Sequence, residues 1–278
     1  KLVDYCLKSD RNFFEERPLL LDVADQIENW YFNPDQKVLN LSMPTRMGKT
    51  RLATLFSAWL FTRFPTKRIL RSSFSAELAE QTSIQTKQTY LSFIEKLKQD
   101  IPQILIPQII GTRSRWSIGN QSQPNMIATG YEGTITGFGA DIGIFDDMSK
   151  NIKTAKSAAF DSDLNGFLES VVYGRLENER KIMNVGTRWT QNDWFTKFNP
   201  DVEIIIPAMT DEVVSVCENW KSTPELLSEK EKVSEFIWSA QYQQRPTVSG
   251  RIRLLENWKP KFSDVSEFQK QFITIDPS

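Results

Sequence analysis

The sequence of 278 residues contains no histidine. Histidine is the usual acid and base near neutral pH and the commonest metal ligand, so its absence removes the Ser-His-Asp and Cys-His mechanisms. Any catalysis by this chain must therefore rest on carboxylates, on cations or on a bound metal ion.

Cysteine is also scarce, and long apolar runs are missing. Cys6 and Cys217 are far apart and have no neighbouring ligand residues, which favours a reduced compartment, no zinc site and a packing role for both. No stretch of about eighteen apolar residues occurs, and the N-terminal segment lacks the apolar core of a signal peptide, so neither membrane spanning nor secretion is supported. Because the first residue is Lys1 rather than methionine, we expect a processed chain or a fragment.

The charge of the chain is nearly balanced, with 34 Lys and Arg against 35 Asp and Glu. A net charge of -1 gives no overall attraction for nucleic acid, so binding of DNA or RNA needs a local basic surface. Hydrophobic residues make up 40% of the chain, which is enough to bury a substantial core in one large domain or in two.

Hydrophobic spacing predicts strands that alternate with helices. Short apolar segments typical of strands cover residues 38–42, 67–74, 125–130, 140–147, 180–189 and 202–208. Apolar residues recur at helical spacing over 49–64, 75–98, 157–178 and 223–244. Strands joined by crossover helices indicate an α/β fold with a mostly parallel sheet flanked by helices. The charged helical part after about Met209 predicts a small helical subdomain, and a last apolar segment at 268–278 predicts a strand that begins a further domain.

The segment between the first strand and the helix after it matches the second half of a phosphate-binding loop. Gly48, Lys49 and Thr50 fit the end of the pattern G-x-x-x-x-G-K-[ST], in which backbone N–H groups and the lysine hold phosphates and the hydroxyl binds Mg²⁺. Met43 stands where the first glycine is expected, so the loop must enter by a different path, which Pro44 can fix. We predict nucleotide binding by Pro44, Thr45, Arg46, Met47, Gly48, Lys49 and Thr50. Taken alone, the tripeptide is equally compatible with a lysine at the start of a helix.

Two adjacent acids end the apolar segment 140–147. In an open parallel sheet, ligands bind at the carboxyl ends of the strands, which places Asp146 and Asp147 beside the loop. Asp146 would hold Mg²⁺ through water, and Asp147 would polarise the attacking water. When the pair is seen alone, a strand end followed by a solvated acidic turn explains it as well.

Four further residues belong to the predicted site. Thr187 and Arg188 end the segment 180–189, where they can contact a γ-phosphate and report hydrolysis, although a simple turn is the alternative. Arg46 lies in the loop, and its guanidinium geometry suits phosphate oxygens. Arg175 continues an apolar helical stripe, so it is either an arginine finger for the nucleotide of a neighbouring subunit or a helix-end arginine that reaches water.

Five segments, in this order, resemble the large terminase subunit of tailed bacteriophages: "MPTRMGKT", "GYEGTITGFGADIGIFDDMSKN", "NVGTRW", "WSAQYQQRP" and "FITIDPS". The resemblance covers nearly the whole chain, and the lead into the double aspartate and the G-T-R-W tetrapeptide are its most specific parts. It implies a P-loop NTPase domain of the additional-strand catalytic-acid type, which drives double-stranded DNA into a capsid, followed by an RNase H-like nuclease domain. Met43 fits this family, whose loop is often deviant.

The resemblance also implies roles for single residues. Lys49 and Thr50 match the phosphate-loop pair, Arg46 the loop arginine, Asp146 the magnesium carboxylate, Asp147 the catalytic acid, and Thr187 and Arg188 the coupling motif. Asp276 resembles the first metal ligand of the nuclease, but its partner carboxylates would lie beyond Ser278. We therefore expect no DNA cleavage by this chain alone.

The organisation and partners of the chain follow from the same resemblance. We expect an ATPase core at 1–209, a helical lid and linker at 210–268, and the first strand of the nuclease domain at 269–278. The implied cofactors are ATP and Mg²⁺. The implied partners are double-stranded DNA, the portal protein of the procapsid, the small terminase subunit and further copies of this chain in a ring. No membrane is implied, and the expected location is the host cytoplasm at the portal. Lys150, Lys153 and Lys156 are candidates to grip DNA, although three spaced lysines equally form a solvated face.

Three other functions stay open. A helicase-like translocase shares the fold but needs further nucleic-acid motifs, which the sequence lacks. An ATP-binding assembly module with little turnover fits Met43 and the aspartate, rather than the usual glutamate, at position 147. A nuclease would need residues beyond Ser278.

Overall fold

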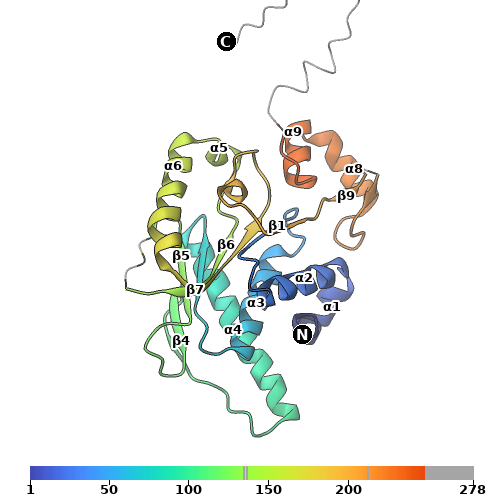
Figure 1. Ribbon diagram of the computed structural model, residues 1–278. Coiled ribbons are helices and arrows are strands. Elements are labelled where there is room, and N and C mark those ends of the chain that lie inside the picture. The colour runs from blue at the N-terminus through green and yellow to red at the C-terminus, as the bar shows by residue number, and fades with distance from the viewer. Residues whose placement is uncertain (134, 136, 212, 248–278) are drawn as a thin grey trace, which may run out of the picture. The chain divides into compact units, whose positions relative to one another are not determined.

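The computed structural model describes residues 1–133, 135, 137–211 and 213–247, and residues 1–247 form one compact unit (Figure 1). The strand predicted at 269–278, Asp276 within it, and the part of the predicted lid from residue 248 onward lie outside the described residues.

Within the described residues, eight strands form one sheet in the order β3-β4-β5-β2-β6-β7-β1-β8. The strands are β1 (Val38–Ser42), β2 (Ile69–Ser73), β3 (Ile109–Gly111), β4 (Arg115–Ile118), β5 (Met126–Gly130), β6 (Ala140–Asp146), β7 (Leu176–Gly186) and β8 (Val202–Ile205). Six of them pair in parallel, whereas β3 and β4 form an antiparallel edge. All six predicted strands are present, which confirms the mostly parallel sheet.

The position of β7 defines the type of sheet. This strand lies between β1, which leads into the loop at 43–50, and β6, which ends at Asp146, and it pairs in parallel with both. One added strand thus separates the loop strand from the acidic strand. This order confirms the predicted fold class, a P-loop NTPase fold of the additional-strand type.

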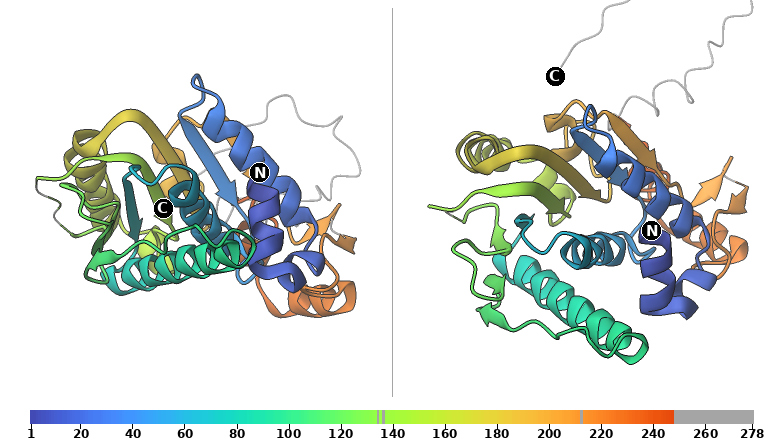
Figure 2. Two further views of the ribbon diagram at one scale, coloured as in Figure 1. Left: turned by 90° about the horizontal axis from the view of Figure 1, so that it is seen from below. Right: turned by 60° about the horizontal axis from the view of Figure 1, so that its bottom comes forward.

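The helices cover both faces of the sheet. On one face lie α1 (Leu2–Glu15), α2 (Leu19–Phe32), α3 (Lys49–Arg63) and α4 (Ala76–Asp100); on the other lie α6 (Ala158–Phe167) and the π-helical η1 (Leu168–Val172). The right-hand view of Figure 2 shows α3 and α4 on one side of the strands and α6 on the other. Short helices α5 (Ile152–Ala155), α7 (Tyr173–Arg175) and η2 (Trp194–Lys197) connect these elements.

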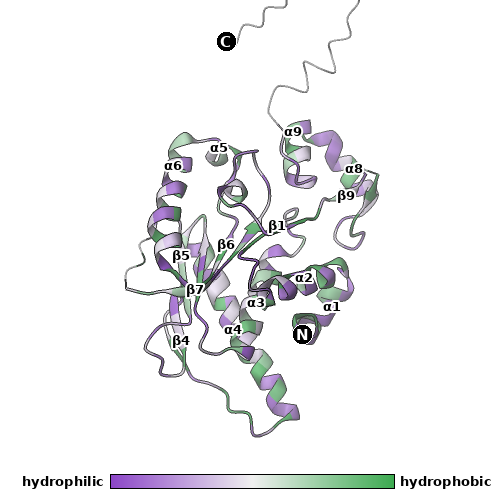
Figure 3. Ribbon diagram, viewed as in Figure 1, coloured by the Kyte–Doolittle hydropathy of each residue, from purple (hydrophilic) through white to green (hydrophobic). Residues whose placement is uncertain are grey.

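Alternate residues of the central strands enter two different cores. Ile69 and Ile144 pack against the α1–α4 side, whereas their neighbours Leu70 and Phe145 pack against the α6 side. Side chains of successive strand residues point to opposite faces, so one strand serves both cores. Coverage of both faces explains why the middle of β6 is apolar at Ile142, Ile144 and Phe145 and why all seven positions of the strand are buried. By contrast, α4 carries both hydrophilic and hydrophobic residues along its length, as a helix at the surface does (Figure 3).

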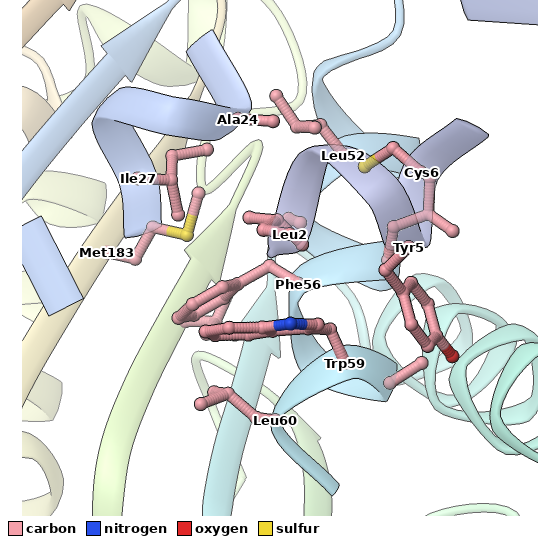
Figure 4. Close-up of a cluster of buried hydrophobic side chains, with 14 of the residues drawn as sticks. Leu2, Tyr5, Cys6, Ala24, Ile27, Leu52, Phe56, Trp59, Leu60 and Met183 are labelled. Carbon is pink, nitrogen blue, oxygen red and sulfur yellow. The ribbon is translucent and has the colours of Figure 1, made fainter. Parts of the chain in front are cut away.

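The first core extends to the N-terminal helices α1 and α2. These two helices were not predicted from the hydrophobic spacing of the sequence. Figure 4 shows Leu2 and Cys6 of α1 and Ile27 of α2 in one buried cluster with Leu52, Phe56 and Trp59 of α3. Burial of each large apolar side chain stabilises the fold by about 1.5–3 kcal/mol. Burial also raises the pKa of the Cys6 thiol to about 12, which fits the predicted packing role. The two N-terminal helices are therefore an integral part of the unit.

The helix predicted over 157–178 ends earlier than expected. The helical path runs through α6, η1 and α7 to Arg175, and β7 then begins at Leu176, four residues before the predicted start of that strand. Leu176 pairs with Ala140 of β6 and is buried in the second core. Pairing and burial in the sheet override the helical spacing at this boundary.

The part that follows the sheet has a small core of its own. It contains a two-stranded pair, β9 (Met209–Thr210) and β10 (Val214–Ser215), and the helices α8 (Thr223–Lys232), α9 (Glu235–Ile237) and η3 (Trp238–Tyr242). Ala208, Met209, Leu226 and Trp238 form a separate buried cluster. The predicted lid boundary at 209 and 210 stays a prediction, but the helical character of 223–242 is confirmed. Among the described helices, none is long and apolar enough to cross a membrane.

Candidate nucleotide site

The loop at 43–50 leaves β1 as a continuation of the sheet. The Met43 N–H donates to the Gly186 carbonyl at 3.1 Å, and the Met43 side chain is fully buried. The left-handed backbone conformations fall on Arg46, with φ +62°, and on Gly48, with φ +126°. Methionine is therefore compatible with the first position of this loop, because the turn that usually needs glycine there is made further along.

Gly48 is held under the two N-terminal helices. A Cβ at this position would lie 2.7 Å from the Phe13 ring and 2.9 Å from Leu20, in addition to the strain of its positive φ. Phe13 and Leu20 would have to shift to admit a side chain, and the positive φ would remain strained for a residue other than glycine. The path of the loop is thus set by α1 and α2 as well as by its own sequence.

Lys49 is the first residue of α3 and is almost completely buried. Its ammonium donates to Thr187 Oγ1 at 2.9 Å and lies 3.3 Å from Asp147 Oδ2. The structure thus brings together a residue from the loop, one from the end of β6 and one from the end of β7. A buried ammonium held by these two oxygens can exchange them for phosphate oxygens without moving far.

Thr50 connects the loop to the first of the two acids. Its hydroxyl donates to Asp146 Oδ1 at 3.0 Å, while Asp146 Oδ2 accepts from Arg71 Nη2 of β2 at 2.7 Å. Among the described residues no group of three His, Cys, Asp or Glu side chains could hold a metal ion. Magnesium, however, commonly takes one or two protein oxygens and completes its shell with water and phosphate. The hydroxyl of Thr50 and the carboxylate of Asp146 fit that requirement.

Asp147 is fixed at both its backbone and its side chain. Its φ is +46°, its N–H donates to the Val185 carbonyl at 2.8 Å, and its Oδ1 accepts from the Thr187 N–H at 3.1 Å. Partial burial raises the pKa of the Asp147 carboxyl, the Lys49 ammonium opposes this rise, and the Asp146 carboxylate adds to it. The Asp147 side chain keeps 38% of its surface exposed.

Thr187 and Arg188 lie side by side but face different partners. Thr187 contacts Lys49 and Asp147 and also donates its hydroxyl to the Met43 carbonyl at 3.0 Å. The Arg188 guanidinium instead pairs with Asp193 at 2.9 Å, and the Arg188 N–H donates to Gln244 Oε1 at 3.1 Å. Gln244 follows η3, so the end of β7 connects the loop to the helices beyond the sheet.

Three groups of predicted residues lie away from this cluster. Thr45 and Arg46 are exposed on the loop, whereas Pro44 and Met47 are buried beneath it. Arg175 precedes β7, at the opposite end of that strand from Thr187. Leu176 pairs with Ala140, and Val185 pairs with Asp146 six residues further along β6, so the two ends of β7 lie about 20 Å apart at roughly 3.3 Å per residue. Arg175 therefore does not belong to the site of its own chain, and a role in a neighbouring subunit stays a prediction.

The three candidate lysines after the two acids are spread along a surface segment. Lys150 and Lys153 are exposed, and the Lys156 ammonium lies 4.6 Å from the centre of the Phe236 ring in α9. Their predicted contact with DNA stays a prediction.

Sequence reasoning missed Arg71, Asp193 and Gln244. A signal existed for the first: Arg71 is the one charged residue in the apolar and small segment "ILRSS" of β2, and a cation there needs an acidic partner. Asp193 and Gln244 carry no comparable signal, because their contacts with Arg188 depend on how the chain folds back after β7.

The order and direction of the strands and helices match those of a known structure. The HK97 bacteriophage large terminase superposes with a TM-score of 0.56 at 12% sequence identity, over 82% of this chain and 50% of that one. The chain has the fold of a bacteriophage large terminase. This finding confirms the predicted resemblance at the level of the fold. No protein-family profile and no curated protein sequence matches the chain.

Two other large terminases were found with lower scores. The ATPase domain of the Thermus phage P74-26 large terminase has a TM-score of 0.45 at 12% identity, over 77% of this chain and 90% of that one. The large terminase of a thermophilic bacteriophage, in complex with ADP, has a TM-score of 0.41 at 8% identity, over 76% of this chain and 50% of that one. The chain spans half the length of the HK97 protein and half that of the ADP-bound terminase.

Proposed function

We propose that this chain is the ATP-hydrolysing part of a large terminase, the motor that moves double-stranded viral DNA into a procapsid. One observation carries the proposal: at the carboxyl ends of β1, β6 and β7, Lys49 contacts Thr187 and Asp147, and the next residue, Thr50, is bonded to Asp146. The fold shared with the HK97 large terminase supports it.

Phosphate binding would take place at the N-terminus of α3. The helix begins at Lys49, so the N–H groups of its first turn have no acceptor within the helix and can donate to phosphate oxygens. Arg46 is exposed on the loop and can add its guanidinium to the same phosphates. On binding, Lys49 would leave Asp147 and Thr187 for the β- and γ-phosphate oxygens.

Thr50 Oγ1 and Asp146 would hold the Mg²⁺ that accompanies ATP. The ion would neutralise phosphate charge and orient the γ-phosphate when bound. The contact between Thr50 and Asp146 keeps both oxygens at one point before any ligand arrives.

Asp147 is the residue that would orient the attacking water. Its Oδ1 is held by the Thr187 N–H, while its Oδ2 becomes free once Lys49 turns to the phosphates. A carboxylate with one fixed and one free oxygen can accept a hydrogen bond from water in a defined direction. Aspartate can therefore serve at this position despite being shorter than glutamate.

The site has a physical connection to the predicted lid. A shift of Lys49 removes one of the three partners of Thr187, and the next residue, Arg188, is bonded to the buried Gln244. Hydrolysis would change the contacts of Thr187 and Arg188 and move the helices after Met209. This link from loop to lid is what a motor needs and a passive nucleotide site does not.

The chain would act as a ring of copies in the host cytoplasm, docked on the portal protein of the procapsid and supplied with DNA by the small terminase subunit. Arg175 would reach the nucleotide of a neighbouring copy, and lysines such as Lys150 and Lys153 would contact DNA phosphates without reading sequence. In the longer protein, Asp276 would begin a metal-dependent nuclease site.

Steady-state ATP hydrolysis, measured over a range of protein concentrations, tests the proposal. We expect magnesium-dependent turnover that rises with concentration, is abolished by Lys49→Ala and falls about 10²–10⁴-fold in Asp147→Asn with binding retained. Arg175→Ala should keep ATP binding and lose the rise with concentration.

The alternative functions give different results. Nucleotide binding with no turnover at any concentration, unchanged by Asp147→Asn, would replace the motor by an assembly module. Turnover stimulated by single-stranded rather than double-stranded nucleic acid would favour a helicase-like translocase.

A further inference from the structure

Arg71 is the most deeply buried charge in the described part of the chain. It lies in the middle of β2, between Ala128 of β5 and Ile144 of β6, and its side chain is fully shielded from solvent. Desolvation of a guanidinium is unfavourable and must be offset by a partner. A buried arginine in a strand of apolar and small residues therefore needs a specific reason.

The contacts of Arg71 are concentrated on one oxygen. Nη2 donates to Asp146 Oδ2 at 2.7 Å, whereas Nε and Nη1 are buried without a protein hydrogen-bond partner. A guanidinium has five N–H groups in a planar fork, so a residue kept only to satisfy the fold would use more of them. The contacts of Arg71 thus serve Asp146 rather than the general packing of β2.

The two carboxylate oxygens of Asp146 have different partners, Arg71 for Oδ2 and Thr50 for Oδ1. Because Oδ2 is held by Arg71 inside the sheet, Oδ1 must face Thr50 at the surface of the site. The carboxylate cannot rotate without leaving the buried cation unpaired, which is strongly unfavourable. Arg71 also offsets the negative charge of Asp146, so the two acids and the two cations, Lys49 and Arg71, balance before any ligand binds.

We propose that Arg71 is a positioning residue that locks the Asp146 carboxylate with Oδ1 toward Thr50, and so makes magnesium bind together with the nucleotide. The proposal rests on the proposed function, since it concerns the same metal position. Without Arg71, Asp146 gains rotational freedom and an uncompensated negative charge. The chain should then bind free magnesium more readily but gain less nucleotide affinity from it.

The chain offers a matched control in Lys181. It is another buried cation, in β7, but its ammonium donates to the backbone carbonyls of Trp30 at 2.8 Å and Asn33 at 2.6 Å, at the end of α2. Lys181→Met removes a buried charge far from the loop, as Arg71→Met removes one beside it. A general loss of packing would affect both Lys181→Met and Arg71→Met, whereas a loss of metal positioning would affect only Arg71→Met.

The test is an equilibrium titration with a fluorescent ADP analogue, in Mg²⁺ and in EDTA. We expect Mg²⁺ to raise the affinity of the wild type and of Lys181→Met by the same factor. In Arg71→Met that factor should fall at least tenfold, while affinity in EDTA changes less than threefold. In Arg71→Lys, which keeps the charge, the factor should lie between those of the wild type and Arg71→Met. Arg71→Lys replaces Arg71→Met in the test if circular dichroism shows that Arg71→Met does not fold.

A double-mutant comparison separates positioning from packing. If Arg71 acts through Asp146, then adding Arg71→Met to Asp146→Asn should not lower the magnesium effect further, and the double variant should melt at a higher temperature than Asp146→Asn. A folded Arg71→Met or Arg71→Lys protein with the full magnesium effect overturns the proposal and leaves the proposed function intact. Absence of nucleotide binding by the wild type overturns the proposed function instead.

Discussion

The two edges of the central sheet contain similar residues in opposite circumstances. At the amino ends of the strands, Lys181 donates to three backbone carbonyls, and Arg68 pairs with Asp141 at 3.2 Å and with Glu177 at 3.0 Å. Each of these two cations is already paired with acceptors of its own chain. They hold helix α2 and the starts of β6 and β7 in place.

At the carboxyl ends, the charged groups are paired in ways that a ligand can replace. Lys49 is held by Thr187 and Asp147, and Thr50 by Asp146, through side chains that all face the N-terminus of α3. Phosphate oxygens and a magnesium ion can take over each of these contacts. The comparison shows that Lys181, whose partners are backbone carbonyls, is a structural charge, whereas Lys49, whose partners are side chains, can exchange them for a ligand.

The largest expected effect is the loss of the carboxylate of Asp146. Asp146→Ala leaves the Arg71 guanidinium buried without its partner, so we expect the free energy of unfolding to fall by about 3–5 kcal/mol, in addition to the loss of hydrolysis. Urea denaturation followed by circular dichroism measures the change. A fall of less than about 1 kcal/mol would show that the ion pair does not hold β2 to β6 as described.

The second largest effect on stability is expected from a substitution of Gly48, whose backbone conformation suits glycine. Gly48→Ala introduces a Cβ at a φ of +126° and within 2.7 Å of Phe13, so we expect a loss of about 1–3 kcal/mol and weaker nucleotide binding. Gly166→Ala in α6 is the control, because its Cβ meets open space and alanine favours a helix by about 0.5–1 kcal/mol. Equal thermal stability of the two variants would contradict the account of the loop.

At the amino edge, the effect should fall on stability alone. Lys181→Met removes the donor from three carbonyls near the end of α2, and we expect the free energy of unfolding to fall by about 1–3 kcal/mol. Denaturation and ATP hydrolysis are measured on the same samples under conditions where both proteins are folded. A loss of turnover by the folded variant would break the distinction between the two edges.

The smallest expected effect lies at the link to the lid. Gln244→Ala leaves the Arg188 N–H without its acceptor, so we expect a loss of about 1–2 kcal/mol and nucleotide affinity close to that of the wild type. Hydrogen exchange of residues 223–242 should respond to nucleotide in the wild type and respond less in the variant. An identical response in both proteins would show that Gln244 does not carry the coupling.

The sequence predicts those parts of the fold whose structure is determined by a few successive residues. The loop with Gly48 and Lys49 and the acidic end of β6 can be recognised because their chemistry is contained in a few successive residues. The edge strands β3 and β4 are short and pair with each other over a turn, so periodicity does not indicate them. The start of β7 at Leu176 depends on Ala140, which is distant in sequence.

The same limit applies to the site. Lys49, Thr50, Asp146, Asp147 and Thr187 meet as predicted, because the carboxyl ends of adjacent parallel strands lie at one edge. The side-chain direction of Arg188, toward Asp193 rather than the loop, could not be predicted, since it follows from the turn after β7.

Calorimetric titration of Mg²⁺ and a non-hydrolysable ATP analogue into the wild type, Lys49→Ala and Lys181→Met tests the central claim most directly. The account predicts one site per chain in the wild type, loss of binding in Lys49→Ala and unchanged binding in Lys181→Met. Binding that survives Lys49→Ala, or that is lost equally in both variants, would contradict the assignment of the carboxyl edge as the nucleotide site.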